Sequence, residues 1–363
     1  MVRLFGKDYT KEELLARVGD ISQVGGVTQK VLDSGAERGV RAIDFRTGLG
    51  FDFTVLADRG LDISMCTFNG QPLNWRAACG DKSPAFYEEP GLGWLRNFYG
   101  GLVVTCGMTT AGAPSVDEGK QLGLHGRFSN TPASNVYADG AWHEDEYFMW
   151  AEGKIREAVL FGENIECKRT VTAKLGEPRL WIVDEVTNLG IKDTPHMMLY
   201  HINIGFPVID GGARLISPTK SYQPRDAEAE IGKEQYAEFP DPVPGFKERC
   251  YYHEMAEDED GMVTAAIANP NFDNGKGFGV YIRYPKEQLP KFTQWKMVSE
   301  QEYVCGLEPA NCWVQGRAME RERGTLQILK PGETREYHVE IGALCCQGAI
   351  AEIEEAVNKA LGR

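Results

Sequence analysis

Two histidines and one glutamate are the residues of this chain whose types and surroundings best fit proton-transfer chemistry. They are His125 within GLHGR, His201 within LYHIN and Glu308 within CGLEP. An enzyme that moves protons near neutral pH without a metal needs groups that change protonation state there, and histidine with a tuned carboxylate meets this need. A single histidine is more often structural than catalytic. The three together predict an acid–base site.

Three further motifs accompany these residues along the chain. They are LADRGLDI at residues 56–63, GGLVVTCG at 100–107 and LKPGET at 329–334. Each motif is short, but all occur in one order between residues 40 and 344. In that order the chain resembles the aldose 1-epimerase (galactose mutarotase-like) superfamily, and more closely a divergent, DUF4432-like branch of it.

The resemblance implies a fold and a reaction. The fold is a large antiparallel β-supersandwich. In the reaction, a base removes the proton of a sugar's anomeric hydroxyl while an acid protonates the ring oxygen, and the opened sugar recloses as the other anomer. By their places in the motifs, Glu308 is expected to be the base, His201 the acid, and His125 the residue that holds the sugar near its ring oxygen. This chemistry requires no cofactor.

The segment around His201 departs from the better-known members of the superfamily. They carry Asn-His-x-Tyr-Phe-Asn, whereas this chain has Tyr-His-Ile-Asn-Ile-Gly at residues 200–205. Tyr200 and Asn203 are expected to orient His201 or to bind the sugar. The family also uses an aspartate that grips sugar hydroxyls, and Asp210 and Asp273 remain open candidates for it. The resemblance therefore does not identify the sugar.

Sugar sites combine an aromatic face with polar groups. Trp295 is the favoured aromatic residue, because it lies shortly before Glu308, although aromatic residues of β-rich proteins are more often core. Arg96 and Arg127 lie in or beside motifs, and guanidinium groups bind carboxylate or phosphate through two hydrogen bonds. Since Arg127 follows His125 by two residues, it predicts a preference for an acidic sugar.

The composition limits the kinds of partner. The chain has 363 residues, a net charge of −14 and a pI near 5.0, which disfavours nucleic acid and anionic membrane surfaces as partners. The expected ligand is a small sugar or sugar acid, and a homo-oligomer remains open. There is no signal-like N-terminus or membrane-length apolar run, so a cytoplasmic location is expected. The nine cysteines lack the spacing of a disulfide framework or a zinc site, so reduced thiols are expected.

The pattern along the chain predicts a mostly β protein. TKEE at residues 10–13 has the form of a capping box and predicts a short N-terminal helix. Many short segments rich in β-branched and aromatic residues follow, separated by glycine, proline and asparagine. A turn at residues 331–333 is expected to join two strands into a hairpin, and residues 350–361 have helical periodicity. No linker or repeat divides the chain, so one domain over residues 1–363 is expected.

Other classes of function remain open. A non-catalytic carbohydrate-binding protein would keep the aromatic and guanidinium groups but would not need two titrating groups across one ring. A glycosidase or lyase would need a second carboxylate at a fixed separation from Glu308, or a tyrosine base. A metal-dependent sugar isomerase or epimerase is a third class, because His125, His201 and Glu308 are acceptable ligands. No close histidine spacing supports the metal site.

Overall fold

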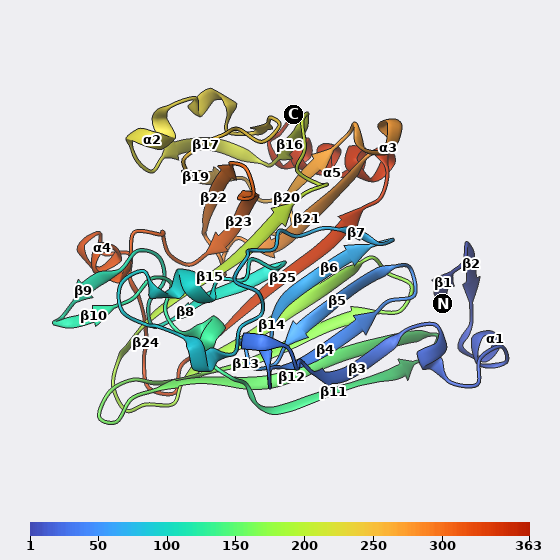
Figure 1. Cartoon of the computed structure of the whole chain (residues 1–363), viewed down its shortest axis with the longest axis horizontal. Coiled ribbons are helices and arrows are strands. Elements are labelled where there is room, and N and C mark those ends of the chain that lie inside the picture. The colour runs from blue at the N-terminus through green and yellow to red at the C-terminus, as the bar shows by residue number, and fades with distance from the viewer.

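Two large antiparallel sheets dominate the computed structural model, which describes residues 1–363 (Figure 1). The nine-stranded sheet has the order β11 (Ser134–His143), β12 (Glu146–Ala158), β13 (Asn164–Lys174), β14 (Arg179–Asn188), β25 (Thr334–Leu344), β21 (Phe278–Pro285), β20 (Met262–Asn269), β16 (Ala213–Ile216) and β18 (Glu238–Phe239).

The twelve-stranded sheet carries the candidate site. Its main path is β17 (Thr219–Pro224), β19 (Arg249–Met255), β22 (Lys291–Val298), β23 (Tyr303–Ala310), β15 (Thr194–Gly205), β8 (Val103–Met108), β6 (Asp62–Phe68), β5 (Phe51–Leu56), β4 (Arg41–Arg46) and β3 (Gly26–Val31). Off this path, β24 (Gln327–Leu329) pairs with β15, and β7 (Gln71–Pro72) pairs with β6. Two small hairpins, β1 (Val2–Leu4) with β2 (Lys7–Tyr9) and β9 (Ser115–Asp117) with β10 (Lys120–Leu122), complete the strands. The mostly β, antiparallel fold class predicted from the sequence is confirmed.

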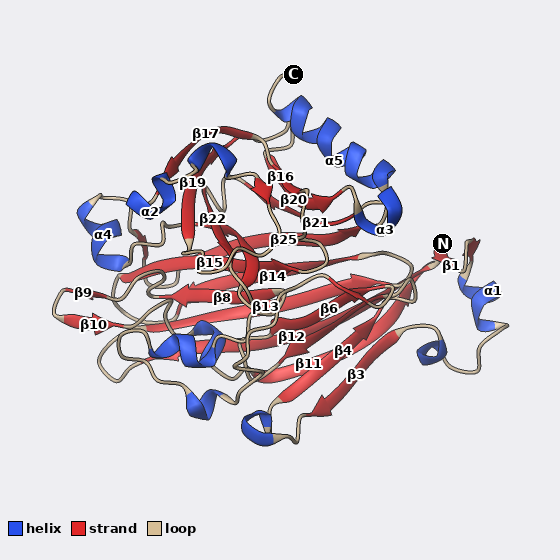
Figure 2. Ribbon diagram, turned by 45° about the horizontal axis from the view of Figure 1, so that its top comes forward, coloured by secondary structure: helices blue, strands red, loops and turns tan.

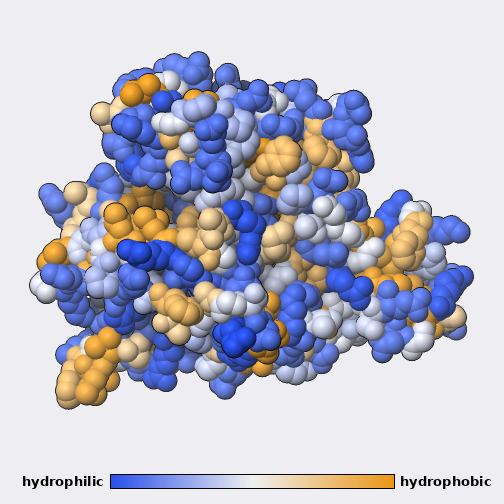
Figure 3. All heavy atoms as spheres, in the orientation of Figure 1, coloured by the Kyte–Doolittle hydropathy of each residue, from blue (hydrophilic) through white to orange (hydrophobic).

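The strands follow the two-residue period of a half-buried sheet. In β13, positions 165, 167, 169, 171 and 173 are buried while their neighbours are partly exposed, because successive side chains point to opposite faces. The buried faces of both sheets contribute to one cluster of 59 residues. Hydrophilic residues dominate the face of the molecule shown in Figure 3, where hydrophobic residues form separate patches.

The helices are short and lie outside the sheets (Figure 2). They are α1 (Lys11–Leu15), α2 (Ala227–Glu230), α3 (Phe272–Gly275), α4 (Arg317–Glu322) and α5 (Gln347–Ala360). The predicted capping box is present: the Thr10 hydroxyl accepts from the amide of Glu13, whose carboxylate accepts from the amide of Thr10. The predicted C-terminal helix is α5, which packs Ile350 and Val357 against β16 and β20. No helix combines the length and apolar character needed to cross a membrane.

The hairpin expected around residues 331–333 does not form. The turn is present, but β24 pairs with β15 while β25 pairs with β14 and β21. Both edges of β25 are therefore occupied, and the strand before the turn joins the other sheet. All nine cysteines are free, six of them buried, while Cys345 is exposed.

Candidate active site

His201 and Glu308 lie on neighbouring central strands of the twelve-stranded sheet. β15 pairs with β23 so that Leu199 is opposite Ala310 and Ile202 is opposite Leu307, and this register sets His201 opposite Glu308. Opposite residues of an antiparallel pair share one face and lie close together. His201 Nε2 is 3.3 Å from Glu308 Oε1, and both side chains are almost completely buried.

A glycine makes room for this pair. Gly306 lies two residues before Glu308 on the same face of β23. A Cβ at Gly306 would be 2.7 Å from Glu308 Oε1, 3.1 Å from His201 Cε1 and 3.2 Å from Trp295 Cβ. The glycine in the CGLEP segment therefore has a packing reason, because any side chain there would displace the Glu308 carboxylate.

His125 reaches the pair from a loop rather than from a strand. It has a left-handed backbone, with φ of 57°, which is uncommon for a residue other than glycine. Its amide donates to the Gly112 carbonyl at 2.8 Å, and its carbonyl accepts from the Gly107 amide at 3.1 Å. Gly126 must be glycine, since a Cβ there would lie 2.3 Å from the Thr110 carbonyl oxygen. The loop brings the His125 ring to 5.8 Å from that of His201, centroid to centroid.

Aromatic rings surround the three residues. Trp94 lies 4.7 Å from His125, Phe98 lies 5.4 Å from His201, and Trp295 lies 5.2 Å from His201, measured between ring centroids. These three aromatic residues line a cavity of about 450 Å³, together with Leu92, Leu95, Leu124 and Val314. His125, His201 and Glu308 also line this cavity. The cavity thus presents acid–base groups surrounded by apolar and aromatic walls, as small-ligand sites commonly do.

The polar end of the cavity was not found from the sequence. Arg225 and Glu248 line it, and Arg225 Nη2 donates to Glu248 Oε1 at 2.9 Å. Trp295 Nε1 donates to Glu248 Oε2 at 2.9 Å, while Arg225 Nε donates to Asp226 at 2.7 Å. Arg225, Asp226 and Glu248 lie in the connection between β17 and β19, and no sequence motif marks them. The only sequence signal for them is their residue type, since one cation and two carboxylates occur within one connection.

Burial sets the protonation of the site. It raises the pKa of Glu308 to about 8, with the nearby Glu248 acting in the same direction and Arg225 against it. Burial lowers the pKa of His201 to about 4. It also lowers the pKa of His125 to about 3, helped by the proximity of His201. Between about pH 4 and pH 8 the His201–Glu308 pair therefore holds one proton, which resides on Glu308, and both histidines are neutral.

The tautomer of His125 follows from its backbone contact. The Gly112 amide donates toward Nδ1 of His125 at 3.4 Å. A neutral imidazole that accepts at Nδ1 carries its proton on Nε2. His125 is therefore a hydrogen-bond donor through Nε2.

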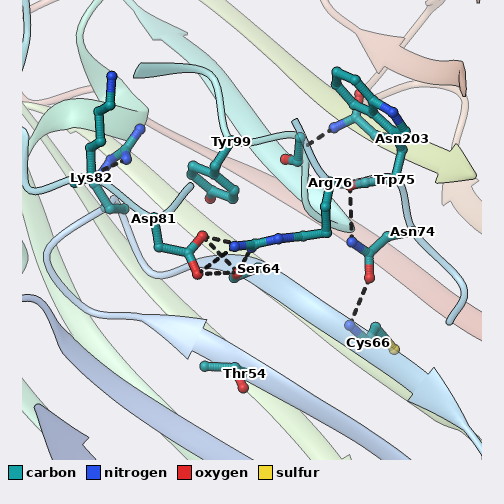
Figure 4. Close-up of polar contacts among 12 residues, drawn as sticks. Thr54, Ser64, Cys66, Asn74, Trp75, Arg76, Asp81, Lys82, Tyr99 and Asn203 are labelled. Atoms are coloured by element: carbon teal, nitrogen blue, oxygen red, sulfur yellow. Dashed lines mark hydrogen bonds and ion pairs between the residues drawn. The ribbon is translucent and has the colours of Figure 1, made fainter. Parts of the chain in front are cut away.

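The structure places the two predicted neighbours of His201 outside the cavity. Tyr200 points to the opposite face of β15, where its hydroxyl donates to Asp184 at 2.6 Å within the sandwich. Asn203 shares the face of His201, but its amide donates to the carbonyls of His201 at 2.9 Å and Gly100 at 3.4 Å. Figure 4 shows Asn203 beside Trp75, in the loop that follows β7. Tyr200 supports the strand from behind, and Asn203 ties it to a loop.

Both predicted arginines also lie outside the cavity lining. Arg127 forms two hydrogen bonds with Glu89, from Nε at 2.7 Å and from Nη2 at 2.5 Å. Arg96 is exposed and pairs with Glu88 at 3.2 Å. The left-handed backbone at His125 and Gly126 turns the chain between His125 and Arg127, so proximity in sequence does not bring their side chains together. Trp295, in contrast, lies in the cavity wall as expected.

The two open aspartate candidates are absent from the cavity lining. Asp210 accepts from the amide of Gly211 at 3.0 Å, and Asp273 lies in α3. Glu248 is the carboxylate that occupies the cavity beside Glu308. The chain contains no group of three His, Cys, Asp or Glu side chains arranged to hold a metal ion.

Comparison with family models gives a match over residues 37–343 to the family described as "Domain of unknown function (DUF4432)". The chain belongs to the DUF4432 family. The matched range includes His125, His201 and Glu308 and all strands of both large sheets except β3 and the last residue of β25. The branch predicted from the motifs is thereby confirmed. Curated proteins give no match to the DUF4432 chain.

Solved structures confirm the galactose mutarotase-like fold. A candidate aldose 1-epimerase from Klebsiella pneumoniae subsp. pneumoniae MGH 78578 aligns with a TM-score of 0.88 at 26% identity, covering 93% of this chain and 88% of that one. A galactose mutarotase-like protein from Clostridium acetobutylicum has a TM-score of 0.59 at 14% identity, over 89% and 99% of the two chains. Galactose 1-epimerase from Lactobacillus acidophilus NCFM has a TM-score of 0.57 at 12% identity, over 88% and 99%. The last two show similarity of fold alone.

Proposed function

We propose that the DUF4432 chain is an aldose 1-epimerase that interconverts the anomers of a sugar by general acid–base catalysis. The observation that carries this proposal is the buried contact of 3.3 Å between His201 Nε2 and Glu308 Oε1, at the base of a cavity that His125 also enters. Acid–base catalysis requires a donor and an acceptor that both reach one substrate. The similarity to the candidate aldose 1-epimerase from Klebsiella pneumoniae supports the same assignment.

The single proton of the pair accounts for both steps of the reaction. At rest Glu308, with its higher pKa, holds the proton of the pair. The reactive form arises when this proton passes to His201 across their 3.3 Å contact. Glu308 then removes the proton of the anomeric hydroxyl while His201 protonates the ring oxygen, and the bond between the anomeric carbon and the ring oxygen breaks. Glu308 then holds the proton and His201 is neutral. Rotation about the first carbon–carbon bond and the reverse transfers close the other anomer. The proton count of enzyme and sugar is the same before and after.

His125 has a separate role in this scheme. It remains neutral over the working range because its pKa lies near 3. Its Nε2 proton is therefore available for a hydrogen bond to the ring oxygen or a neighbouring hydroxyl, which orients the sugar over the pair. The rings of Trp94 and Trp295 supply apolar surface for the faces of the sugar.

The charges at the polar end favour a neutral sugar over a sugar acid. Arg225 is the cation of the cavity, and it already contacts two carboxylates, those of Asp226 and Glu248. An anionic group would have to compete with both. Sugar hydroxyls instead can donate to the Glu248 oxygens and accept from Arg225. This replaces the preference for an acidic sugar inferred from Arg127, whose guanidinium pairs with Glu89 outside the cavity lining.

Exchange NMR of anomeric protons tests the proposal directly. The protein is added to a panel of neutral aldoses and uronic acids, and the rate of exchange between anomers is measured for each. Faster exchange for at least one neutral aldose is expected. Saturable binding of a sugar without faster exchange would show a carbohydrate-binding protein instead. Exchange lost on chelation and restored by a divalent cation would show a metal-dependent isomerase.

A further inference from the structure

The strands that carry Cys250 and Trp295 to the catalytic cavity carry two cations on their opposite face. Arg249 of β19 pairs in register with Lys296 of β22. Residues directly opposite each other in an antiparallel pair have Cβ atoms about 4.5–5.5 Å apart, and like charges in such positions destabilise the sheet. The juxtaposition therefore calls for a compensating negative charge.

These cations open into a second cavity, of about 710 Å³, distinct from the catalytic one. It is lined by residues of the short strands β16 and β18 of the nine-stranded sheet and of β19 and β22 of the other. Phe239, Phe246 and Val243 contribute its apolar wall. Lys296 is only 5% exposed, so its charge is held at an inner position of the sandwich.

Both side chains retain donors that the protein does not use. Lys296 Nζ donates to the carbonyl oxygens of Gln235 at 2.8 Å and Glu238 at 2.5 Å, which leaves one of its three protons. Arg249 Nε is buried and has no partner. The Arg249 guanidinium lies over the Phe246 ring, 4.5 Å from its centroid. Buried polar groups are normally satisfied, so unused donors in a cavity indicate a ligand that accepts hydrogen bonds.

One carboxylate near the cavity pairs with Arg249, and none forms an ion pair with Lys296. Glu228 Oε1 forms an ion pair with Arg249 Nη2 at 3.7 Å, a distance too long for a hydrogen bond. Arg214, a third cation of the lining, pairs with Glu354. Glu238 is exposed and forms no ion pair, and its main-chain carbonyl is the atom that contacts Lys296. Lys296 is thus the cation of the lining that forms no ion pair, and Arg249 has no hydrogen bond to a carboxylate.

We propose that this second cavity binds a small organic anion, whose phosphate or carboxylate group lies between Arg249 and Lys296 and whose apolar part packs against Phe239 and Phe246. A planar guanidinium binds an oxyanion through two hydrogen bonds, and the ammonium group adds a third. The site is separate from the catalytic cavity, so it does not depend on the proposed function.

Isothermal titration calorimetry of the full chain at constant ionic strength tests this site. The probes are phenyl phosphate, benzoate and inorganic phosphate. Saturable binding of phenyl phosphate or benzoate is expected, tighter than that of inorganic phosphate because of the apolar wall, and the better of the two identifies the head group. Arg249→Met and Lys296→Met are each expected to weaken binding at least tenfold. Lys220→Met, which removes an exposed cation from the neighbouring β17, is expected to leave it unchanged.

Thermal melting separates a binding role from a structural one. The probe that binds best should raise the melting temperature of the wild type and of Lys220→Met, but not that of Arg249→Met, since a ligand stabilises only the folded form that binds it. If Lys296→Met does not fold, Arg249→Met and Arg249→Lys carry the test, and Arg249→Lys should retain part of the affinity. Absence of saturable binding to the folded wild type would overturn the proposal. Equal weakening in Lys220→Met would also overturn it.

Discussion

Glu308 Oε1 lies 3.3 Å from His201 Nε2 across two hydrogen-bonded strands, and both side chains are almost completely buried at the wall of the cavity. The strand register holds the two side chains close together, because both residues project from neighbouring strands in the middle of a twelve-stranded sheet. A site built on strands holds its groups more rigidly than one built on loops. The acid–base pair is therefore part of the scaffold, while His125 and Arg225 come to it from connections.

The pH dependence follows from the single proton of the pair. Below about pH 4 both His201 and Glu308 are protonated and no base remains; above about pH 8 both are deprotonated and no acid remains. The profile of kcat/KM should therefore be bell-shaped, with limbs near these two values that belong to the pair as a whole. Anomer exchange measured from pH 3.5 to 9.5 checks this. A rate that continues to rise tenfold per pH unit beyond pH 9 would contradict it.

Gly306→Ala should reduce activity while leaving the fold intact. The added Cβ would lie 2.7 Å from Glu308 Oε1, at the end of a flexible side chain that can move away. A displacement of this size is expected to lower kcat/KM by about 10- to 100-fold. Gly348→Ala in α5 is the control, since its Cβ would meet only Cys346 Sγ at 3.8 Å. Anomer exchange and circular dichroism of both variants give the comparison, and full activity of Gly306→Ala would remove the steric argument.

Arg225→Met and Arg127→Met should differ in their effect on sugar binding. Arg225 lines the cavity, so its loss should raise KM by about tenfold or more with a smaller change in kcat, since it contacts hydroxyls away from the reacting atoms. Arg127 pairs with Glu89 outside the lining, and its loss should leave KM within about twofold. Steady-state kinetics on one sugar decide between them. A large rise in KM for Arg127→Met alone would restore the role inferred from its sequence position.

The ionised Glu308 carboxylate should lower the free energy of unfolding at high pH. Its pKa is about 8 in the folded state and near 4.5 when unfolded, so the folded state binds the proton more tightly. The contribution of the protonated Glu308 to the free energy of unfolding is fully present below pH 4.5 and is lost as the pH rises through 8. Because each pKa unit corresponds to about 1.4 kcal/mol, Glu308→Gln should be more stable than the wild type by a few kcal/mol at pH 9.

Denaturant unfolding at pH 5 and pH 9 measures this difference. The stability gain of Glu308→Gln should be small at pH 5 and large at pH 9. Glu355→Gln on the exposed face of α5 should show little change at either pH. An equal gain at both pH values would mean that the amide stabilises the protein for another reason.

The sequence allowed prediction of the fold class and of the three residues that meet in the cavity, because both leave local patterns. Alternating burial appears as a period of two, and His125, His201 and Glu308 each stand in a short motif. Trp295 could be placed because β22 and β23 are joined by a short turn, so that Trp295 faces Gly306.

The other residues of the site could not be placed from the sequence, because their positions depend on how distant segments of the chain pack together. Tyr200 was expected beside the sugar because it adjoins His201, yet adjacent residues of a strand face opposite ways. Arg127 was expected there because it follows His125, but the left-handed turn separates them. Arg225 and Glu248 enter from a connection that folds over the end of the sheet, and their positions depend on the pairing of β17 with β19 and β22.

The two histidines should differ in their kinetic effects. His201→Asn removes a group that transfers a proton, so kcat should fall by about 10²–10⁴-fold. His125→Asn removes a hydrogen-bond donor that orients the sugar, so KM should rise along with a smaller loss of kcat. Anomer exchange at several sugar concentrations separates the two effects. Wild-type rates in both variants would contradict the roles assigned here.

The most direct test of the central claim is the rate of anomer exchange catalysed by Glu308→Gln, measured by exchange NMR at pH 7 with a sugar that the wild type converts. The amide keeps the shape of the carboxyl group but cannot accept the proton. The proposed chemistry predicts a rate lower by about 10²–10⁴-fold, in a variant that still folds and binds the sugar. A rate close to that of the wild type would show that Glu308 is not the base.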